Sequence, residues 1–262
     1  MTIPLEVLQK WAKPGRNEMS KQTYAVLRDV LLERLNISES DIYLQGSYRN
    51  HTNVRDNSDI DIVVEFGPNT NVCKVKDYVY GKILNSHNFQ FTKGSKTVKY
   101  KGYSGIYVPA DIVPCVTVKG EENCVKLYDS SRGTVIKNYP KVHIHNGEEK
   151  SGNTNGNFKN AVRILKNARN YLNDKGIRTN ISSYTIECML YNIPDTEFQG
   201  NESEVCYNTL SWLLNNKHSV DTMRTQDDHS LLFMNTNLSI VGAKQFINDA
   251  AELWNNWGRY RK

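Results

Sequence analysis

The chain has 262 residues, of which 39% are hydrophobic and 23% are charged, an ordinary composition for a globular protein that buries a sizeable core. Its 33 basic and 28 acidic side chains give a formal net charge of +5, too small an excess to require a nucleic-acid partner. No apolar run approaches the roughly 20 residues that cross a bilayer, and no signal-peptide pattern opens the sequence, so we expect a cytoplasmic protein without a membrane partner.

The cysteines exclude two further classes of protein. There are five of them, an odd number, and no two are spaced as Cys-x-x-Cys. Neither a disulfide framework nor a zinc knuckle is therefore indicated. We expect reduced thiols that are mostly buried.

The first predicted element is a helix that Ser20 caps. Its apolar residues recur at steps of three and four, at Tyr24, Leu27, Leu31 and Leu35. They make one apolar face, which we expect to back a sheet.

A short apolar strand that ends at Gln45 follows this helix, and Gly46-Ser47 begins a tight turn. Glycine lets a ligand approach the backbone closely, and the amide groups of the turn and the Ser47 hydroxyl can face a phosphate. Such a pair on its own is usually only a turn, so its meaning depends on the residues that follow.

The next predicted strand, residues 60–64, is rich in β-branched side chains. Asp59 and Asp61 are two residues apart and therefore project from the same face. Two carboxylates buried side by side repel each other, which is costly unless a cation lies between them. Magnesium fits this place, because it is a hard ion that takes carboxylate and phosphate oxygens.

A segment with strand character, residues 89–98, is followed by a second apolar run, residues 106–118, that carries Asp111. Pro109 and Pro114 interrupt the run and indicate an edge or neighbouring strand with irregular ends. Three carboxylates on adjacent strands can hold two ions about 3.5–4 Å apart, one activating a hydroxyl and one neutralising a departing pyrophosphate. The pattern predicts phosphoryl-type transfer from a nucleoside triphosphate.

These motifs resemble the polymerase-β-type nucleotidyltransferase superfamily. The residues that carry the resemblance are Gly46-Ser47, Thr52, Ser58-Asp59-Ile60-Asp61 and Asp111-Ile112-Val113-Pro114. Within the superfamily, residues 44–53 are most similar to the bacterial cGAS/DncV-like nucleotidyltransferases, the cyclic-oligonucleotide synthases of anti-phage signalling. The resemblance implies a mixed α+β fold: a polymerase-β-like core sheet with an N-terminal helix, packed against a C-terminal helical lobe.

The composition shifts to Gly, Asn, Glu, Lys, Ser and Thr over residues 146–157, which predicts a mobile loop. We place the domain boundary there, with a nucleotidyltransferase catalytic lobe over residues 1–150, a helical nucleotide-binding lobe over residues 151–262, and the active-site cleft between them. Before the loop, His143 and His145 alternate on an expected strand. Because no cysteine lies nearby, a structural role is favoured over a metal-binding pair.

Beyond the loop the sequence predicts helices over residues 158–172, 183–191, 202–217 and 242–257. In the first of them, Lys159, Arg163 and Lys166 form a basic stripe, which is either a solvated face or a phosphate-binding surface. The resemblance implies that Lys166 contacts the phosphates of the donor nucleotide.

The second of these helices begins at a Ser-Ser-Tyr sequence. Ser182 or Ser183 can serve as its N-cap, and Tyr184 can be a core residue. A similar Ser-Tyr pair in the resembled family implies instead that the Ser183 hydroxyl contacts the donor phosphates and that the Tyr184 ring stacks on the base.

The resemblance implies an enzyme that condenses ATP, with UTP or GTP, into a cyclic di- or trinucleotide and releases pyrophosphate. This second messenger would act on a downstream effector in anti-phage defence. The expected cofactor is a pair of Mg²⁺ ions, with Mn²⁺ as a substitute. The expected catalytic and metal residues are Asp59, Asp61 and Asp111, and the expected nucleotide-binding residues are Gly46, Ser47, Lys166, Ser183 and Tyr184.

Two alternatives stay open from the residues alone. The same catalytic pair occurs in nucleotidyltransferases that act on a tRNA end, a small-molecule hydroxyl or a protein. A catalytically inactive nucleotide-binding module is the other alternative. No zinc-ligand spacing and no concentrated basic tract occurs in the sequence, so we expect no obligatory nucleic acid, and we expect a monomer.

Overall fold

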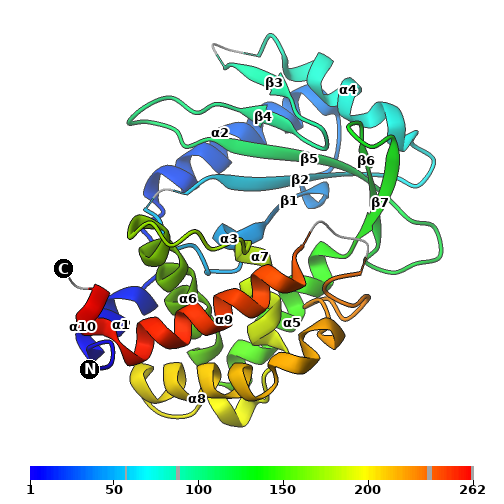
Figure 1. The fold of residues 1–262 in the computed structure, drawn as a ribbon. Coiled ribbons are helices and arrows are strands. Elements are labelled where there is room, and N and C mark those ends of the chain that lie inside the picture. The colour runs from blue at the N-terminus through cyan, green and yellow to red at the C-terminus, as the bar shows by residue number, and fades with distance from the viewer. Residues whose placement is uncertain (57, 87–88, 235–237, 261–262) are drawn as a thin grey trace. The chain divides into compact units, whose positions relative to one another are not determined.

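A computed structural model describes residues 1–56, 58–86, 89–234 and 238–260. The chain forms two compact units, which Figure 1 colours by position along the sequence. The sheet unit is Gly15–Ile144, and the helical unit combines Met1–Pro14 with His145–Lys262. The start of the chain thus belongs with the helices, whereas the sequence analysis placed all of residues 1–150 in one lobe.

Within the described residues, the sheet unit has one mixed sheet of seven strands. They are β1 (Ile42–Gln45), β2 (Ile60–Phe66), β3 (Phe91–Lys93), β4 (Val98–Tyr100), β5 (Ala110–Thr117), β6 (Val125–Asp129) and β7 (Thr134–Asn138). The order is β1-β2-β5-β4-β3, and β6 pairs with both β5 and β7. β2 and β5 are parallel and the other pairs are antiparallel, which confirms the predicted mixed α+β class.

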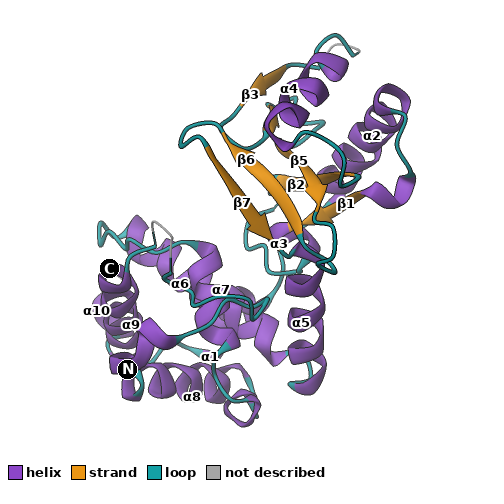
Figure 2. Ribbon diagram, turned by 90° about the vertical axis from the view of Figure 1, so that its right-hand side faces the viewer, coloured by secondary structure: helices purple, strands orange, loops and turns teal. Residues whose placement is uncertain are grey.

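Two helices cover one face of this sheet, α2 (Glu18–Leu35) and α4 (Val72–Ile83), as Figure 2 shows. Leu27, Leu31 and Leu35 of α2 are buried in the core that these helices form with the strands. The predicted apolar face of the first long helix is confirmed, because its three-and-four spacing keeps these side chains on one side.

Ser20 does not cap α2, contrary to the prediction. The helix begins earlier, at Glu18, and Asn17 precedes it. Ser20 is fully buried, and its hydroxyl donates to the backbone carbonyl of Ser58 at 3.1 Å. Its polar side chain therefore joins α2 to the segment that leads into β2.

Pro114 lies in β5, which is the neighbour of β2, so of the two predicted alternatives the neighbouring strand is confirmed and the edge strand is not. The N–H of Ile60 donates to the carbonyl of Pro109 at 3.2 Å, so odd-numbered residues of β5 bond towards β2 and even-numbered ones bond away from it. On that second side β4 pairs only as far as Ile112, and β6 begins to pair at Val116. Pro114 falls between these two partners, where its missing N–H removes no ladder bond.

The helical unit is built from the first residues and the C-terminal half of the chain. Its helices are α1 (Leu5–Ala12), α5 (Pro140–Asn153, which begins in the sheet unit), α6 (Asn157–Asp174), α7 (Ser183–Tyr191), α8 (Glu202–Asn215), α9 (Ile240–Asn255) and α10 (Trp257–Tyr260). The four predicted helices correspond to α6, α7, α8 and α9, and α7 has the predicted bounds. None of the described helices combines the length and the apolar character that crossing a membrane requires.

Most of the predicted loop at residues 146–157 is helical, and the strand expected around His143 and His145 is also wrong. Both histidines lie in α5, where residues two apart point in different directions and do not form a ligand pair. Gly147, which suggested a loop, faces Gln226, and a Cβ at this glycine would lie 2.4 Å from the Gln226 Nε2 atom. The glycine therefore reflects a close tertiary contact of a helix.

Candidate active site

Asp61 and Asp111 are opposite each other on neighbouring strands, because they are partners in the parallel register of β2 and β5. Ile60 and Ile62 point into the core under α2 and α4, so the Asp61 side chain projects from the other face of the sheet, and Asp111 shares that face. Asp59 is exposed and lies just before β2 begins. Two of the three predicted carboxylates are thus set side by side by strand register.

The surroundings of Asp61 oppose its negative charge. Burial, and after it the negative charges of Asp111 and Asp59, together raise the pKa of the Asp61 carboxyl to about 7. A carboxylate in such a place is ionised at neutral pH at a cost in free energy, and a nearby cation would remove that cost.

The donor set fits a divalent cation. Carboxylate oxygens are the ligands that Mg²⁺ prefers, and the charge repulsion at Asp61 is the kind that such an ion relieves. Among the described residues, no three acidic, histidine or cysteine side chains already converge as metal ligands. The three aspartates do not yet surround a common point, and one of them, Asp59, lies outside β2.

Gly46 gives Asp61 the room it occupies. Its backbone has a φ of +72°, and a Cβ at this position would lie 2.1 Å from Asp61 Oδ2. The predicted turn is the start of the one-turn helix α3 (Gly46–Arg49), in which the carbonyl of Ser47 accepts the N–H of Thr52 at 2.9 Å. The glycine is needed twice, for its conformation and for its missing side chain.

Asp111 has a partner that the sequence did not reveal. The hydroxyl of Thr97, in the turn between β3 and β4, donates to Asp111 Oδ1 at 3.1 Å. Nothing about a threonine in a polar turn singles it out. Only the antiparallel register of β4 on β5 brings it beside the carboxylate.

The predicted basic stripe of α6 is not a solvated face. Lys166 is 2% exposed, and its Nζ lies 3.0 Å from Glu187 Oε2 of α7, which is also buried. Arg163 is buried too and donates to the carbonyl of Ala12 and, at 2.5 Å, to Asn160 Oδ1. Burial lowers the pKa of Arg163 to about 10. Both cations are structural groups of the helical unit in this structure.

The two serines at the start of α7 have different roles in the structure: one caps the helix and the other does not. Ser182 is the N-cap, and its hydroxyl accepts the N–H of Thr185 at 3.0 Å. The Ser183 hydroxyl accepts from Arg169 at 3.0 Å. Tyr184 as a residue is 41% exposed, so it is not fully part of the core, although burial is the main cause of the raised pKa of its hydroxyl.

Comparison with known proteins covers both units. A nucleotidyltransferase domain matches residues 26–129, and the cGAS/DncV-like nucleotidyltransferase C-terminal helical domain matches residues 145–255. A cyclic UMP-AMP synthase from Rhodothermus marinus is 30% identical over 99% of this chain and 100% of its own length. The chain belongs to the cGAS/DncV-like nucleotidyltransferases.

Further members of the cGAS/DncV-like family agree. The cyclic nucleotide synthase CdnE01 of Staphylococcus haemolyticus is 31% identical over 98% of this chain and 100% of its own length. The solved structure of Rhodothermus marinus CdnE c-UMP-AMP synthase with Apcpp and Upnpp has a TM-score of 0.86 and 28% identity, over 98% of both chains. These relatives confirm the predicted family, the fold class and the predicted function, that of a nucleotidyltransferase enzyme related along its whole length to cyclic nucleotide synthases.

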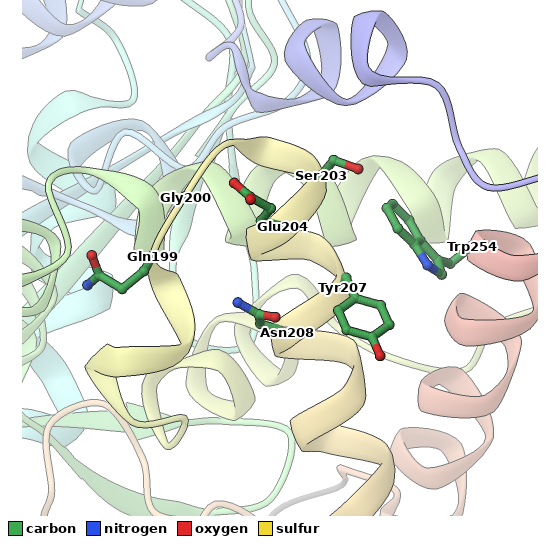
Figure 3. A pocket seen from close by; sticks show the side chains of 7 residues that line it. All are labelled: Gln199, Gly200, Ser203, Glu204, Tyr207, Asn208 and Trp254. Carbon is green, nitrogen blue, oxygen red and sulfur yellow. The ribbon is translucent and has the colours of Figure 1, made fainter.

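One cavity of this cGAS/DncV-like chain lies apart from the predicted nucleotide-binding residues. It has a volume of about 510 Å³ and is lined by Gln199, Gly200, Ser203, Glu204, Tyr207, Asn208 and Trp254, shown in Figure 3. Its one charged lining side chain is Glu204, which accepts the Asn201 N–H at 2.8 Å in the capping box of α8. Because none of its described lining residues is basic, this cavity does not suit a triphosphate.

Proposed function

We propose that Asp59, Asp61 and Asp111 together hold two divalent cations with which this enzyme joins nucleoside triphosphates. The observation that carries the proposal is the register pairing of Asp61 with Asp111, in a place where burial and neighbouring charge oppose ionisation of Asp61. Bound Mg²⁺ would lower the pKa of the acceptor hydroxyl and neutralise charge on the departing pyrophosphate. Asp111 would accept the proton of that hydroxyl and then release it to solvent.

The turn that follows β1 would bind the donor triphosphate. Gly46 keeps the backbone free of a side chain beside Asp61, and the next residue, Ser47, is half-buried at the start of α3. Its hydroxyl and the backbone amide groups there would donate to phosphate oxygens.

Three residues of the helical unit are also proposed to bind nucleotide. The partial exposure of Tyr184 supports stacking on a base, and the Ser183 hydroxyl, which accepts from Arg169, can still donate to a phosphate. Lys166 has less support, because its ammonium would have to exchange its ion pair with Glu187 for a phosphate contact.

ATP and UTP are the proposed substrates, because the relative that matches 99% of this chain is a cyclic UMP-AMP synthase. The product would then be a cyclic dinucleotide with one pyrimidine and one purine base. It would serve as a second messenger for a downstream effector in anti-phage defence, and the enzyme would act as a monomer without an obligatory nucleic acid.

Incubation of the purified protein with the four ribonucleoside triphosphates and Mg²⁺ tests this function. Pyrophosphate release and a phosphatase-resistant product containing UMP and AMP are expected, with the mass of a cyclic dinucleotide. Asp61→Asn and Asp111→Asn should both abolish turnover, and Asp29→Asn, at an exposed aspartate of α2, should leave it unchanged.

Other outcomes would support the alternatives. With a labelled triphosphate, the nucleotide label could be transferred to added RNA or to a small hydroxyl compound. That result, with no free nucleotide product, would indicate a different acceptor. No turnover of any triphosphate, together with measurable binding, would indicate an inactive nucleotide-binding module. A cyclic product with other bases would leave the enzyme class intact and overturn only the assignment of UTP.

A further inference from the structure

The turn between β3 and β4 is a structural partner of Asp111. Its Thr97 hydroxyl donates to Asp111 Oδ1 at 3.1 Å, and the turn is closed by the N–H of Gly94, which donates to the carbonyl of Thr97 at 2.8 Å. β4 continues directly from the turn and places Lys99 opposite Asp111 in the antiparallel register. The turn therefore holds one oxygen of a carboxylate that the proposed function assigns to catalysis.

The side chain of Lys76, in α4, anchors the same turn by hydrogen bonds. This side chain is 6% exposed, and its ammonium donates to Gly94 O at 2.8 Å, Ser95 O at 2.6 Å and Ser130 Oγ at 2.8 Å. Three donors meet three acceptors, so the ammonium is fully used. The N–H and the hydroxyl of Ser130 also donate to Ser95 O, at 3.0 and 2.9 Å.

A buried ammonium is costly unless every donor is bonded, and the burial of Lys76 lowers its pKa. A turn on a sheet edge could be closed by its own backbone bonds without this group. Here two consecutive carbonyls, of Gly94 and Ser95, are fixed by one side chain that projects from a helix packed on the sheet. The arrangement leaves the turn little freedom and thereby fixes the position of Thr97.

We propose that Thr97 is a positioning residue for Asp111, and that the Lys76 anchor acts on Asp111 through Thr97. This inference rests on the proposed function, because it assumes that Asp111 holds a cation. A hydrogen bond to Oδ1 fixes the rotation of the carboxylate and leaves Oδ2 available to a cation. Removal of such a supporting bond typically lowers metal affinity or activity about 10–100-fold.

Thr97→Val tests the positioning role, because it removes the hydroxyl and keeps the shape of the side chain. We expect kcat to fall about 10–100-fold with little change in the KM for triphosphate. Mn²⁺ binding measured by electron paramagnetic resonance, with a non-hydrolysable nucleotide and no turnover, should weaken about tenfold. Thr97→Ser retains the hydroxyl and should restore most of both quantities.

The matched control is Thr134→Val, the same substitution at an exposed threonine of β7, which should change neither quantity. Wild-type kcat and wild-type Mn²⁺ binding in Thr97→Val would overturn the proposal. A loss in Thr97→Ser as large as in Thr97→Val would also overturn it, because the methyl group and not the hydroxyl would then matter.

Asp111→Asn separates this inference from the proposed function. If Asp111→Asn abolishes turnover while Thr97→Val behaves as the wild type, only the positioning role fails. If Asp111→Asn turns over triphosphate normally, the assignment of Asp111 fails, and the positioning role fails with it.

The anchor is tested with a double-mutant cycle of Lys76→Met and Thr97→Val. If Lys76 acts on Asp111 only through Thr97, the double variant should have the kcat of Thr97→Val alone. Losses that add independently would overturn this part of the proposal. If thermal unfolding shows that Lys76→Met does not fold, Ser130→Ala, which removes one acceptor of the anchor, takes its place in the cycle under the same criterion.

Discussion

Gly46 is the residue at which backbone and chemistry are most tightly linked. Its positive φ suits glycine, and its missing side chain is what lets Asp61 Oδ2 occupy a position 2.1 Å from where a Cβ would be. Any other residue here has to displace the carboxylate, the turn or both. The requirement follows from one side-chain contact and is independent of any phosphate that the turn binds.

Gly46→Ala is therefore expected to reduce turnover in a protein that still folds. The backbone strain should cost about 1–2 kcal/mol of unfolding free energy, and the displaced Asp61 should lower kcat at least tenfold. Gly105→Ala is the control, because Gly105 has a similar φ of +77° and no atom within 4 Å of its Cβ position. Equal kcat losses in the two variants, measured by pyrophosphate release, would contradict the role of the contact with Asp61.

Asp61 should also make stability depend on pH in the absence of divalent cations. Its pKa is raised from 3.8 to about 7, so the folded state binds this proton more tightly than the unfolded state does. The resulting stability is present at low pH and is lost as pH rises from about 4 to about 7. Asp61→Asn removes this dependence, and its stability relative to the wild type should increase by about 3–4 kcal/mol over that window.

Urea unfolding in EDTA, at about pH 5 and about pH 8, measures the effect. A constant difference between variant and wild type at the two pH values would show that the Asp61 proton is not linked to folding. Adding Mg²⁺ near pH 8 should stabilise the wild type and have a smaller effect on Asp61→Asn, since the ion binds the folded carboxylates.

At the scale of elements, a buried ion pair is one of the contacts that join α6 to α7. Lys166 and Glu187 are 2% and 6% exposed and lie 3.0 Å apart. The cost of removing both charges from water offsets much of their attraction, so the pair adds little net stability. Each charge is nevertheless needed to compensate the other. Losing one partner is much worse than losing both.

Lys166→Met should destabilise the protein by about 3–5 kcal/mol, and Lys166→Met with Glu187→Leu should recover most of that loss. Arg16→Met is the control, because it breaks an exposed pair with Asp56 at 2.8 Å and should cost less than about 1 kcal/mol. If Lys166 also contacts donor phosphates, the double variant should regain stability without regaining turnover. Recovery of both would assign Lys166 to structure alone.

Some of these elements could be predicted from the sequence and others could not. β2 and α7 were predictable because their signals are local: alternating β-branched residues beside two aspartates, and a serine N-cap before an apolar run. α5 was not, because Gly147 and its neighbours have loop composition while the contact with Gln226 that explains the glycine is distant in sequence. For the same reason the burial of Lys166 and the bond from Thr97 to Asp111 require partners that only tertiary structure supplies.

At the scale of the whole molecule, the helical unit is assembled from both ends of the chain. Leu8 of α1 is fully buried in its core, Trp11 packs edge to face on Trp257 at 5.9 Å, and the carbonyl of Met1 accepts the Trp257 N–H at 3.0 Å. The sheet unit, by contrast, is one continuous segment, Gly15–Ile144.

Leu8→Ala should therefore weaken the helical unit by about 2–5 kcal/mol, as expected for a cavity in a packed core. Leu5→Ala, the same change on the same helix at a side chain that is 39% exposed, should cost much less. Calorimetry that resolves two transitions should show the Leu8→Ala shift in the helical unit alone. An equal effect on the transition of the sheet unit would show that α1 supports both.

The split origin of the helical unit has a consequence for how the protein is made. During synthesis the chain emerges from its N-terminus, so α1 leaves the ribosome long before its packing partners α6 and α8, and Trp257 of α10, exist. The sheet unit can fold as soon as Ile144 has emerged, while α1 waits with an apolar face exposed. A nascent chain of this enzyme thus passes through a stage in which its carboxylate strands can be in place while the apolar face of α1 has no partner helix yet.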